Sequence, residues 1–210
     1  MDVSRETAGA VFGPELERAA EFARLLVTDG VVRGLIGPRE ADRIWERHLL
    51  NSAVVVQACP PAGLVIDVGS GAGLPGIPMA LARPDLTVRL VEPLLRRVTF
   101  LGEVVQRLGL TNVDVVRGRA EEMHGRWTAS TVTARAVAPL EKLARWCLPL
   151  VAPGGSLLAL KGERAEAELT AATPSLAALG VVSASVEEVG VGVIDPPVRL
   201  VRLTRAAGRD

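Results

Sequence analysis

A glycine-rich segment preceded by an acidic residue is the stretch of the chain best suited to chemistry. It reads LVIDVGSGAGLPGIP over residues 64–78, with Asp67 two residues before Gly69. Glycine accepts positive φ and lets a ligand approach the backbone closely, so this turn is a candidate binding loop. Two glycine patterns overlap in it, one ending at Gly73 and one at Gly76, and they are typical of different cofactors.

The charge of Asp67 favours one of these cofactors. Gly-x-Gly-x-x-Gly, with Glu92 about 20 residues further on, is the pattern of dinucleotide enzymes, whose pyrophosphate a nearby carboxylate would repel. Gly-x-Gly-x-Gly after an acidic residue is the pattern of S-adenosylmethionine enzymes, and that cofactor carries a cationic amino group and a cationic sulfonium. We therefore expect S-adenosyl-L-methionine, bound by Asp67, Gly69, Gly71 and Gly73. The alternatives are an NAD-type oxidoreductase, a non-catalytic binding module, and an Asp67 that serves only as a helix cap or loop acceptor.

Further candidate positions follow the next two predicted strands. Glu92 ends the second strand, where a carboxylate can accept hydrogen bonds from both ribose hydroxyls. Ala120 and Glu121 follow the third strand, where a side-chain acid and backbone groups can bind adenine. Taken alone, Glu121 equally fits a solvated acid at a helix start. Its place after the third strand favours the binding role.

Strands and helices alternate from residue 64 onward, which predicts an α/β fold with a doubly wound, mostly parallel, Rossmann-like sheet. The expected strands are 64–68, 87–92, 113–118, 130–137 and 156–162, the last entered through a turn at 153–155. The expected helices are 75–82, 95–109, 139–151 and 163–180, the last one broken at Pro174, and an antiparallel pair closes the sheet at the C-terminus. Because ligands bind at the carboxyl ends of such strands, the candidate loop and acids lie at the expected edge.

Two predicted helices, over residues 14–30 and 39–58, come before the first strand. Pro14 suits the first turn of one helix, and Gly30 suits its C-terminal cap. These helices predict an N-terminal helical cap over residues 1–60. The S-adenosylmethionine-binding domain is then expected over 61–210, as a single compact unit.

The composition predicts a soluble protein without a strong overall charge. The chain has 210 residues with 24 basic and 24 acidic side chains, and all of the basic ones except Lys142 and Lys161 are arginine. Two cysteines and two well-separated histidines predict neither a disulfide framework nor a metal site. The N-terminus lacks the secretory pattern, and glycine and proline interrupt the longest uncharged run, so we expect a cytoplasmic monomer without a membrane segment.

Six segments, in order along the chain, carry a resemblance to one family. They are RHLLNS (47–52), DVGSGAGLPGIP (67–78), EPLLRRVTFL (92–101), GRAEE (118–122), ARAVAPL (134–140) and ALKG (159–162). On these segments the chain resembles the bacterial ribosomal RNA small-subunit methyltransferase G family, also called glucose-inhibited division protein B. The resemblance implies an S-adenosylmethionine-dependent enzyme that methylates N7 of a guanine in 16S ribosomal RNA, near the decoding site, as free rRNA or in the small ribosomal subunit. A methyltransferase that acts on another RNA is the alternative.

The resemblance also implies roles for individual residues. The cofactor contacts that it implies are Gly69, Leu74, Ala120, Glu121 and Arg135, with Glu92 at the ribose. Many relatives have Asp where this chain has Glu92, which keeps the carboxylate. Many relatives also have Asp where this chain has Asn51. This replacement loses a carboxylate, so we assign Asn51 no charge-dependent role.

Methylation of guanine N7 requires little of the protein beyond binding. N7 carries a lone pair and no proton, so no general base is needed, and catalysis comes mainly from proximity and orientation. Arginine and lysine near the cofactor would bind guanine O6 and the flanking phosphates. The candidates are Arg47, His48, Arg96 and Arg97 as RNA-binding residues, and Arg135 and Lys161, at strand ends, as catalytic residues. Surface ion pairing is the alternative for each charged residue, and packing between cap and sheet is the alternative for His48. Packing is expected for both cysteines. It is also expected for Trp45, Trp127 and Trp146, with stacking on a flipped base as their alternative.

Overall fold

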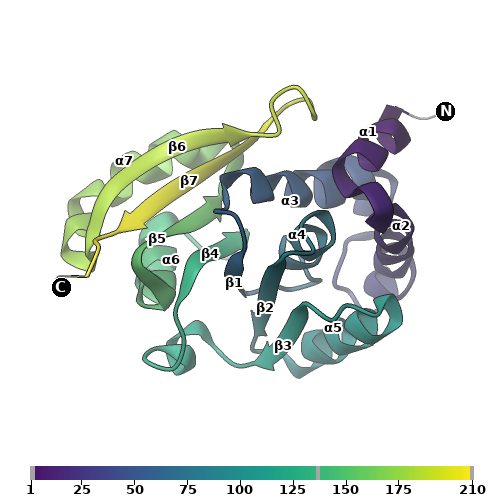
Figure 1. Ribbon diagram of the computed structural model, residues 1–210, viewed down its shortest axis with the longest axis horizontal. Coiled ribbons are helices and arrows are strands. Elements are labelled where there is room, and N and C mark those ends of the chain that lie inside the picture. Colours follow the sequence, from purple (N-terminus) through teal and green to yellow (C-terminus); the bar gives the residue numbers. More distant parts are fainter. Residues whose placement is uncertain (1–2, 136–137, 209–210) are drawn as a thin grey trace.

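One seven-stranded sheet forms the centre of the molecule in the computed structural model, which describes residues 3–135 and 138–208 (Figure 1). The strands are β1 Gly63–Val68, β2 Leu86–Glu92, β3 Val113–Arg117, β4 Ala129–Arg135, β5 Val151–Leu160, β6 Val181–Val189 and β7 Val198–Arg205. Their order across the sheet is β3-β2-β1-β4-β5-β7-β6. The strands β1 to β5 pair in parallel, whereas β7 runs antiparallel to both β5 and β6. The predicted doubly wound sheet with an antiparallel C-terminal strand is confirmed.

Helices cover both faces of the sheet because its central strands are apolar on both sides. The helices after the strands are α4 Gly76–Ala82, α5 Leu95–Leu108, α6 Leu140–Cys147 and α7 Ala165–Leu176. Successive side chains of a strand point to opposite faces. Val65 and Leu158 accordingly pack with α4, α5 and the N-terminal helices, whereas their neighbours Ile66 and Leu157 pack with α6 and α7.

The N-terminal helices share the first of these two cores with the sheet. They are α1 Val3–Phe12, η1 Gly13–Glu15, α2 Leu16–Leu25, η2 Leu26–Gly30, η3 Pro38–Arg43, η4 Ile44–Leu50, α3 Asn51–Ala53 and η5 Val54–Ala58. Phe22, Leu26 and Leu49 are fully buried in one cluster with Val65 of β1. The helix α1 was not expected from the sequence. The division into a cap and a domain at residue 60 stays a prediction. The apolar side chains of the cap and those on one face of the sheet form a single core.

Two local expectations differ from the structure. The turn expected at residues 153–155 is a bulge inside β5, because β4 pairing jumps from Ala129↔Val151 to Thr131↔Ser156. A Cβ on Gly155 would lie 2.6 Å from the Ser130 carbonyl oxygen, so only glycine permits this close approach. The break expected at Pro174 does not occur there, because α7 continues to Leu176, and proline interrupts only the last turn.

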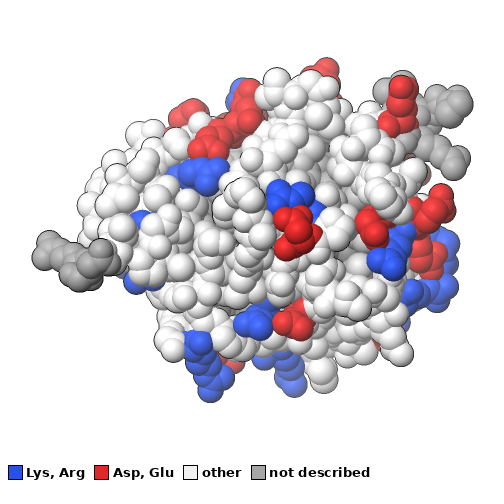
Figure 2. All heavy atoms as spheres, viewed as in Figure 1, with Lys and Arg blue, Asp and Glu red and all other residues white. Residues whose placement is uncertain are grey.

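Charged side chains of both signs are interspersed over the face of the molecule shown in Figure 2. This agrees with the equal numbers of acidic and basic residues in the chain. Within residues 3–135 and 138–208, no helix has the length and apolar character needed to cross a lipid bilayer. The same residues bring no three His, Cys, Asp or Glu side chains together as a metal site.

Candidate functional site

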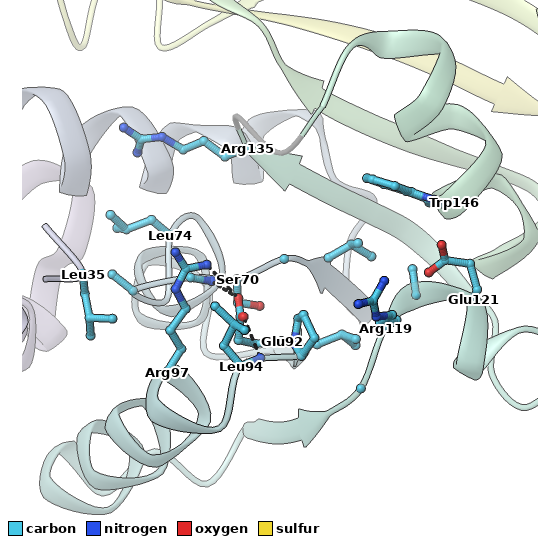
Figure 3. Close-up of a pocket in the computed structure, with 18 of the residues that line it drawn as sticks. Leu35, Ser70, Leu74, Glu92, Leu94, Arg97, Arg119, Glu121, Arg135 and Trp146 are labelled. Atoms are coloured by element: carbon cyan, nitrogen blue, oxygen red, sulfur yellow. Dashed lines mark hydrogen bonds and ion pairs between the residues drawn. The ribbon is translucent and has the colours of Figure 1, made fainter. Parts of the chain in front are cut away.

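A cavity of about 680 Å³ opens at the carboxyl ends of β1 to β4, which is where an open α/β sheet binds its ligands (Figure 3). Its volume suits a small-molecule cofactor. The lining comes from the loops after β1, β2 and β3, the end of β4, one residue of α6 and the cap. Its lining residues include Leu35, Ile36, His48, Gly69, Ser70, Gly71, Leu74, Glu92, Leu94, Arg97, Arg119, Ala120, Glu121, Arg135 and Trp146.

The glycine-rich loop forms the floor of this cavity and is fixed to β2. The Gly69 and Ser70 N–H groups donate to the Val91 carbonyl, at 2.8 and 3.3 Å. Gly69 and Gly71 have φ angles of 69° and 59°, which other residues rarely adopt. The loop therefore presents backbone to the cavity where side chains would otherwise fill it.

Asp67 lies beneath this loop, fully buried, and does not line the cavity. Its Oδ2 accepts a hydrogen bond from the Gly76 N–H at the start of α4, at 3.1 Å, as in the helix-cap interpretation. Its Oδ1 is buried and has no hydrogen-bond partner among the described residues. Burial raises the pKa of Asp67 to about 7, although the Ser70 hydroxyl and the Gly76 N–H oppose the shift. The sequence predicts Asp67 as a cofactor contact, but its side chain lies under the loop, outside the lining of the cavity.

Glu92 is the carboxylate beside the glycine-rich loop that lines the cavity. Its side chain is 1% exposed, and its oxygens accept hydrogen bonds from the Gly71 and Leu94 N–H groups, both at 3.0 Å. A carboxylate offers about four lone-pair sites, so acceptor capacity remains for a ligand. Arg97 reaches toward it from α5, with Nη1 3.5 Å from Glu92 Oε2 (Figure 3), while its buried Nε has no hydrogen-bond partner among the described residues.

The end of the cavity beside β3 is formed by η6, Ala120–Met123, and by α6. Ala120, Glu121 and Arg119 line it, with Trp146 facing them from α6 (Figure 3). The Lys142 ammonium lies 4.9 Å from the centroid of the Trp146 ring. Sequence reasoning treated Trp146 as a packing residue and did not consider Arg119, because neither belongs to a motif that predicts a pocket.

Arg135, at the end of β4, reaches the cap and not the floor of the cavity (Figure 3). Its Nη1 donates to Ser52 Oγ at 2.9 Å, and its Nη2 donates to the Arg47 carbonyl at 3.1 Å and lies 3.0 Å from His48 Nδ1. His48 is 9% exposed and lines the cavity, and its Nε2 lies 2.8 Å from Glu40 Oε2. The packing interpretation of His48 is therefore the one that its position favours.

Four of the predicted site residues besides Asp67 do not line the cavity. The Lys161 side chain is 6% exposed, and its Nζ donates to the Ala138 carbonyl and pairs with Glu168 Oε2 at 2.9 Å. That same oxygen accepts from the Leu140 N–H at 2.9 Å, so Lys161 fixes the start of α6. Gly73 packs inward, and Arg47 and Arg96 are exposed beyond the rim. Positions 136 and 137, which follow Arg135 in the segment ARAVAPL, lie outside the described residues.

Solved structures with this fold include methyltransferases. An S-adenosylmethionine-dependent O-methyltransferase from Thermotoga maritima aligns with a TM-score of 0.60 at 13% identity, over 77% of this chain and 66% of that one. A precorrin-6y C5,15-methyltransferase from Geobacter metallireducens aligns with a TM-score of 0.54 at 14% identity, over 82% of this chain and 91% of that one. At such low identity these likenesses establish the fold alone.

Sequence comparison is far more specific. Residues 15–194 match the family model described as rRNA small subunit methyltransferase G. A ribosomal RNA small subunit methyltransferase G from Thermobifida fusca is 57% identical over 202 residues, which are 96% of this chain and 85% of the relative. One from Streptomyces avermitilis is 56% identical over 199 residues, or 94% of this chain and 84% of the relative. The chain therefore belongs to the rRNA small subunit methyltransferase G family.

Proposed function

We propose that this chain transfers a methyl group from S-adenosylmethionine to N7 of a guanine in 16S ribosomal RNA, near the decoding site. The observation that carries the proposal is a cofactor-sized cavity at the carboxyl ends of the strands, in a chain 57% identical to a ribosomal RNA small subunit methyltransferase G. A bacterial enzyme with this substrate works in the cytoplasm, and we expect it to act as a monomer.

The described residues of the cavity fit S-adenosylmethionine. Glu92 keeps acceptor capacity for the ribose hydroxyls. Ala120 and Glu121, with Trp146 opposite, form an end suited to adenine, and the open loop at Gly69 suits the amino-acid part. When bound, S-adenosylmethionine would supply a methyl group on a sulfonium, which needs no metal and no covalent enzyme intermediate.

The work left to the chain is binding, orientation and exclusion of water. Guanine N7 carries a lone pair and no proton, so no residue has to remove one, and proximity supplies most of the rate. Leu35 and Ile36 of the cap, and Leu74 and Leu94 around the loop, give the cavity apolar walls that exclude water. Arg97 lines the cavity with its side chain 33% exposed, so its guanidinium is a donor for guanine O6 or a phosphate.

The roles of the basic residues follow from their exposure. Arg47 and Arg96 lie outside the cavity and are exposed, so they suit contacts with RNA phosphates. Arg135 and Lys161 are engaged within the protein, so we propose that they act by holding the walls of the cavity rather than by touching the base.

Two measurements test the proposal. Calorimetry with S-adenosylmethionine and with NAD should show binding of the first only. Methyl transfer from the radiolabelled cofactor to small ribosomal subunits and 16S RNA that lack the modification should place the label on one guanine, at N7. A label on cytosine or on transfer RNA, or binding of NAD alone, would contradict the proposal.

A further inference from the structure

A hydrogen-bond network joins the helical cap to the end of β4 at the wall of the cavity. It runs from Glu40 of η3 through His48 of η4 to Arg135, and Arg135 continues to Ser52 of α3. His48 and Arg135 both line the cavity, and the His48 side chain is 11% exposed. Of the described contacts of the Arg135 guanidinium, all four are with the cap.

The partners of His48 determine which ring nitrogen carries the proton. Nε2 faces the Glu40 carboxylate at 2.8 Å, and an ionised carboxylate only accepts hydrogen bonds, so Nε2 is the donor. Nδ1 faces Arg135 Nη2 at 3.0 Å, and a guanidinium only donates, so Nδ1 must accept. Only the neutral imidazole with its proton on Nε2 satisfies both partners. Protonation of Nδ1 would place two donors and two positive charges against each other.

We propose that His48 is a positioning residue for methyl transfer: its neutral imidazole, oriented by Glu40, holds the Arg135 guanidinium against the cap and so fixes the cavity wall at the end of β4. The proposal rests on the assignment of this cavity to the reaction above. In this role His48 neither contacts RNA nor serves only as a packing residue, because it orients Arg135. The activity then depends on one protonation state of His48.

The charges around His48 set the pH at which this state is lost. Burial lowers the pKa of His48, the Glu40 carboxylate opposes that shift, and the cations of Arg135 and Arg47 add to it. Arg43 faces Glu40 from the same short helix. Because the folded-state pKa lies below the usual value of about 6.5, His48 is neutral at neutral pH and charges only under acid conditions. The positioning contact is therefore complete above about pH 6.5 and is lost as pH falls.

The first experiment measures the pH dependence of kcat and KM for methyl transfer to unmodified small subunits, from about pH 5 to pH 9. Wild type should lose kcat on an acid limb below pH 6.5, with less change in KM. Glu40→Gln keeps an acceptor for Nε2 but removes the charge that favours imidazolium, so its acid limb should move to lower pH. Asp42→Asn removes an exposed carboxylate from the same helix and is the matched control, which should leave the limb in place. His48→Ala should lower kcat at pH 8 by about 10- to 100-fold, as expected from a misplaced wall.

The second experiment does not depend on activity. The chain has only two histidines, His48 and His124, so imidazole NMR can follow each one separately. His48 should be the Nε2–H tautomer at pH 8, and Arg135→Met should raise its pKa by removing the adjacent cation. If wild type transfers no methyl group but His48 is still the Nε2–H tautomer at pH 8, the proposed function is contradicted and the hydrogen-bond network of His48 is not.

Several outcomes would overturn the role of His48. One is a Nδ1–H tautomer at pH 8. Another is an acid limb that stays in place in Glu40→Gln, or that disappears in Asp67→Asn, since the limb would then belong to Asp67. The last is a His48→Ala variant that keeps wild-type kcat at pH 8.

Discussion

The carboxyl group of Asp67 is fully buried, and its Oδ1 has no hydrogen-bond partner among the described residues, so its ionisation makes the stability of the fold depend on pH. Its folded-state pKa, raised by burial to about 7 from 3.8, means that the folded protein holds a proton that the unfolded chain releases. The contribution of Asp67 to the free energy of unfolding is therefore fully present below the unfolded value and is lost as pH rises from about 4 to about 7, by up to about 4 kcal/mol. The Asp67→Asn variant keeps an acceptor for the Gly76 N–H and loses the charge. Its free energy of unfolding should fall less than that of wild type between pH 5 and pH 8, as measured by urea denaturation. Parallel pH profiles for the two proteins would contradict this.

The position of Glu92 leads to a prediction about the affinity for the cofactor. Glu92→Gln leaves the side chain nearly isosteric but removes the charge and one acceptor, and hydrogen bonds to charged groups contribute about 1.5–3 kcal/mol each. The Kd for S-adenosylmethionine should rise about 10- to 100-fold in calorimetry. Stability should also fall by about 1–3 kcal/mol, because the new NH2 group leaves the Gly71 or the Leu94 N–H without its acceptor. Asp114→Asn is the matched control, since Asp114 is 59% exposed in an ion pair with Arg89 on the surface. An unchanged Kd in Glu92→Gln would exclude Glu92 as a ribose acceptor.

The sequence predicted which loops form the site better than which side chains enter it. Motif spacing identified Gly69, Glu92 and Ala120, and all three line the cavity, although their ligand roles stay predictions. The same reasoning could not orient Asp67, because a residue at a strand end can face the loop or the helix behind it. Lys161 was placed at the right strand end, but its partner Glu168 lies on the following helix, and no local pattern signals that pair.

At the scale of elements, the packing of α4 on the sheet depends on one glycine. A Cβ on Gly76 would lie 2.3 Å from Leu90 Cδ2 and 2.8 Å from Asp67 Oδ2, and both neighbours are fully buried. Gly76→Ala should therefore lower the free energy of unfolding by about 1–3 kcal/mol, the usual cost of overpacking. Gly102→Ala is the control, because Gly102 lies in α5 with nothing near its added Cβ, and alanine there should stabilise by about 0.5–1 kcal/mol. Urea denaturation of the two variants should give shifts of opposite sign, and shifts of the same sign would contradict the packing argument.

The sequence predicted strands and helices correctly where a local sequence pattern alone determined them. Apolar β-branched segments and alternating helices sufficed for β1 to β5 and for the helices between them. Local rules failed at Pro153, Gly154 and Gly155, where turn-forming residues lie inside β5, because pairing with β4 on one side and β7 on the other holds the bulge in the sheet. Local rules also failed at Pro174, because this proline lies inside α7, two residues before the helix ends at Leu176.

At the scale of the whole molecule, the cap and the sheet are expected to fold as one unit. Phe22, Leu26 and Leu49 are fully buried in the core that also holds Val65, and burial of each such side chain contributes about 1.5–3 kcal/mol. Their sum approaches the whole stability of a typical domain, which is about 5–15 kcal/mol. Residues 61–210 expressed alone should therefore lack a cooperative unfolding transition in urea, followed by circular dichroism.

The matched control for this truncation is removal of residues 207–210, which follow the last backbone hydrogen bonds of the C-terminal end, made by Ala206 to Gly180 and Gly154. That shorter chain should unfold with the midpoint and slope of the full-length protein, because residues 207 and 208, the described part of the removed segment, belong to no strand and to neither core cluster. If residues 61–210 instead unfold cooperatively, the cap is a separate domain, and the network through His48 then lies at an interface between domains. If they do not, the cap that covers the cavity is held there by the same apolar contacts that stabilise the fold.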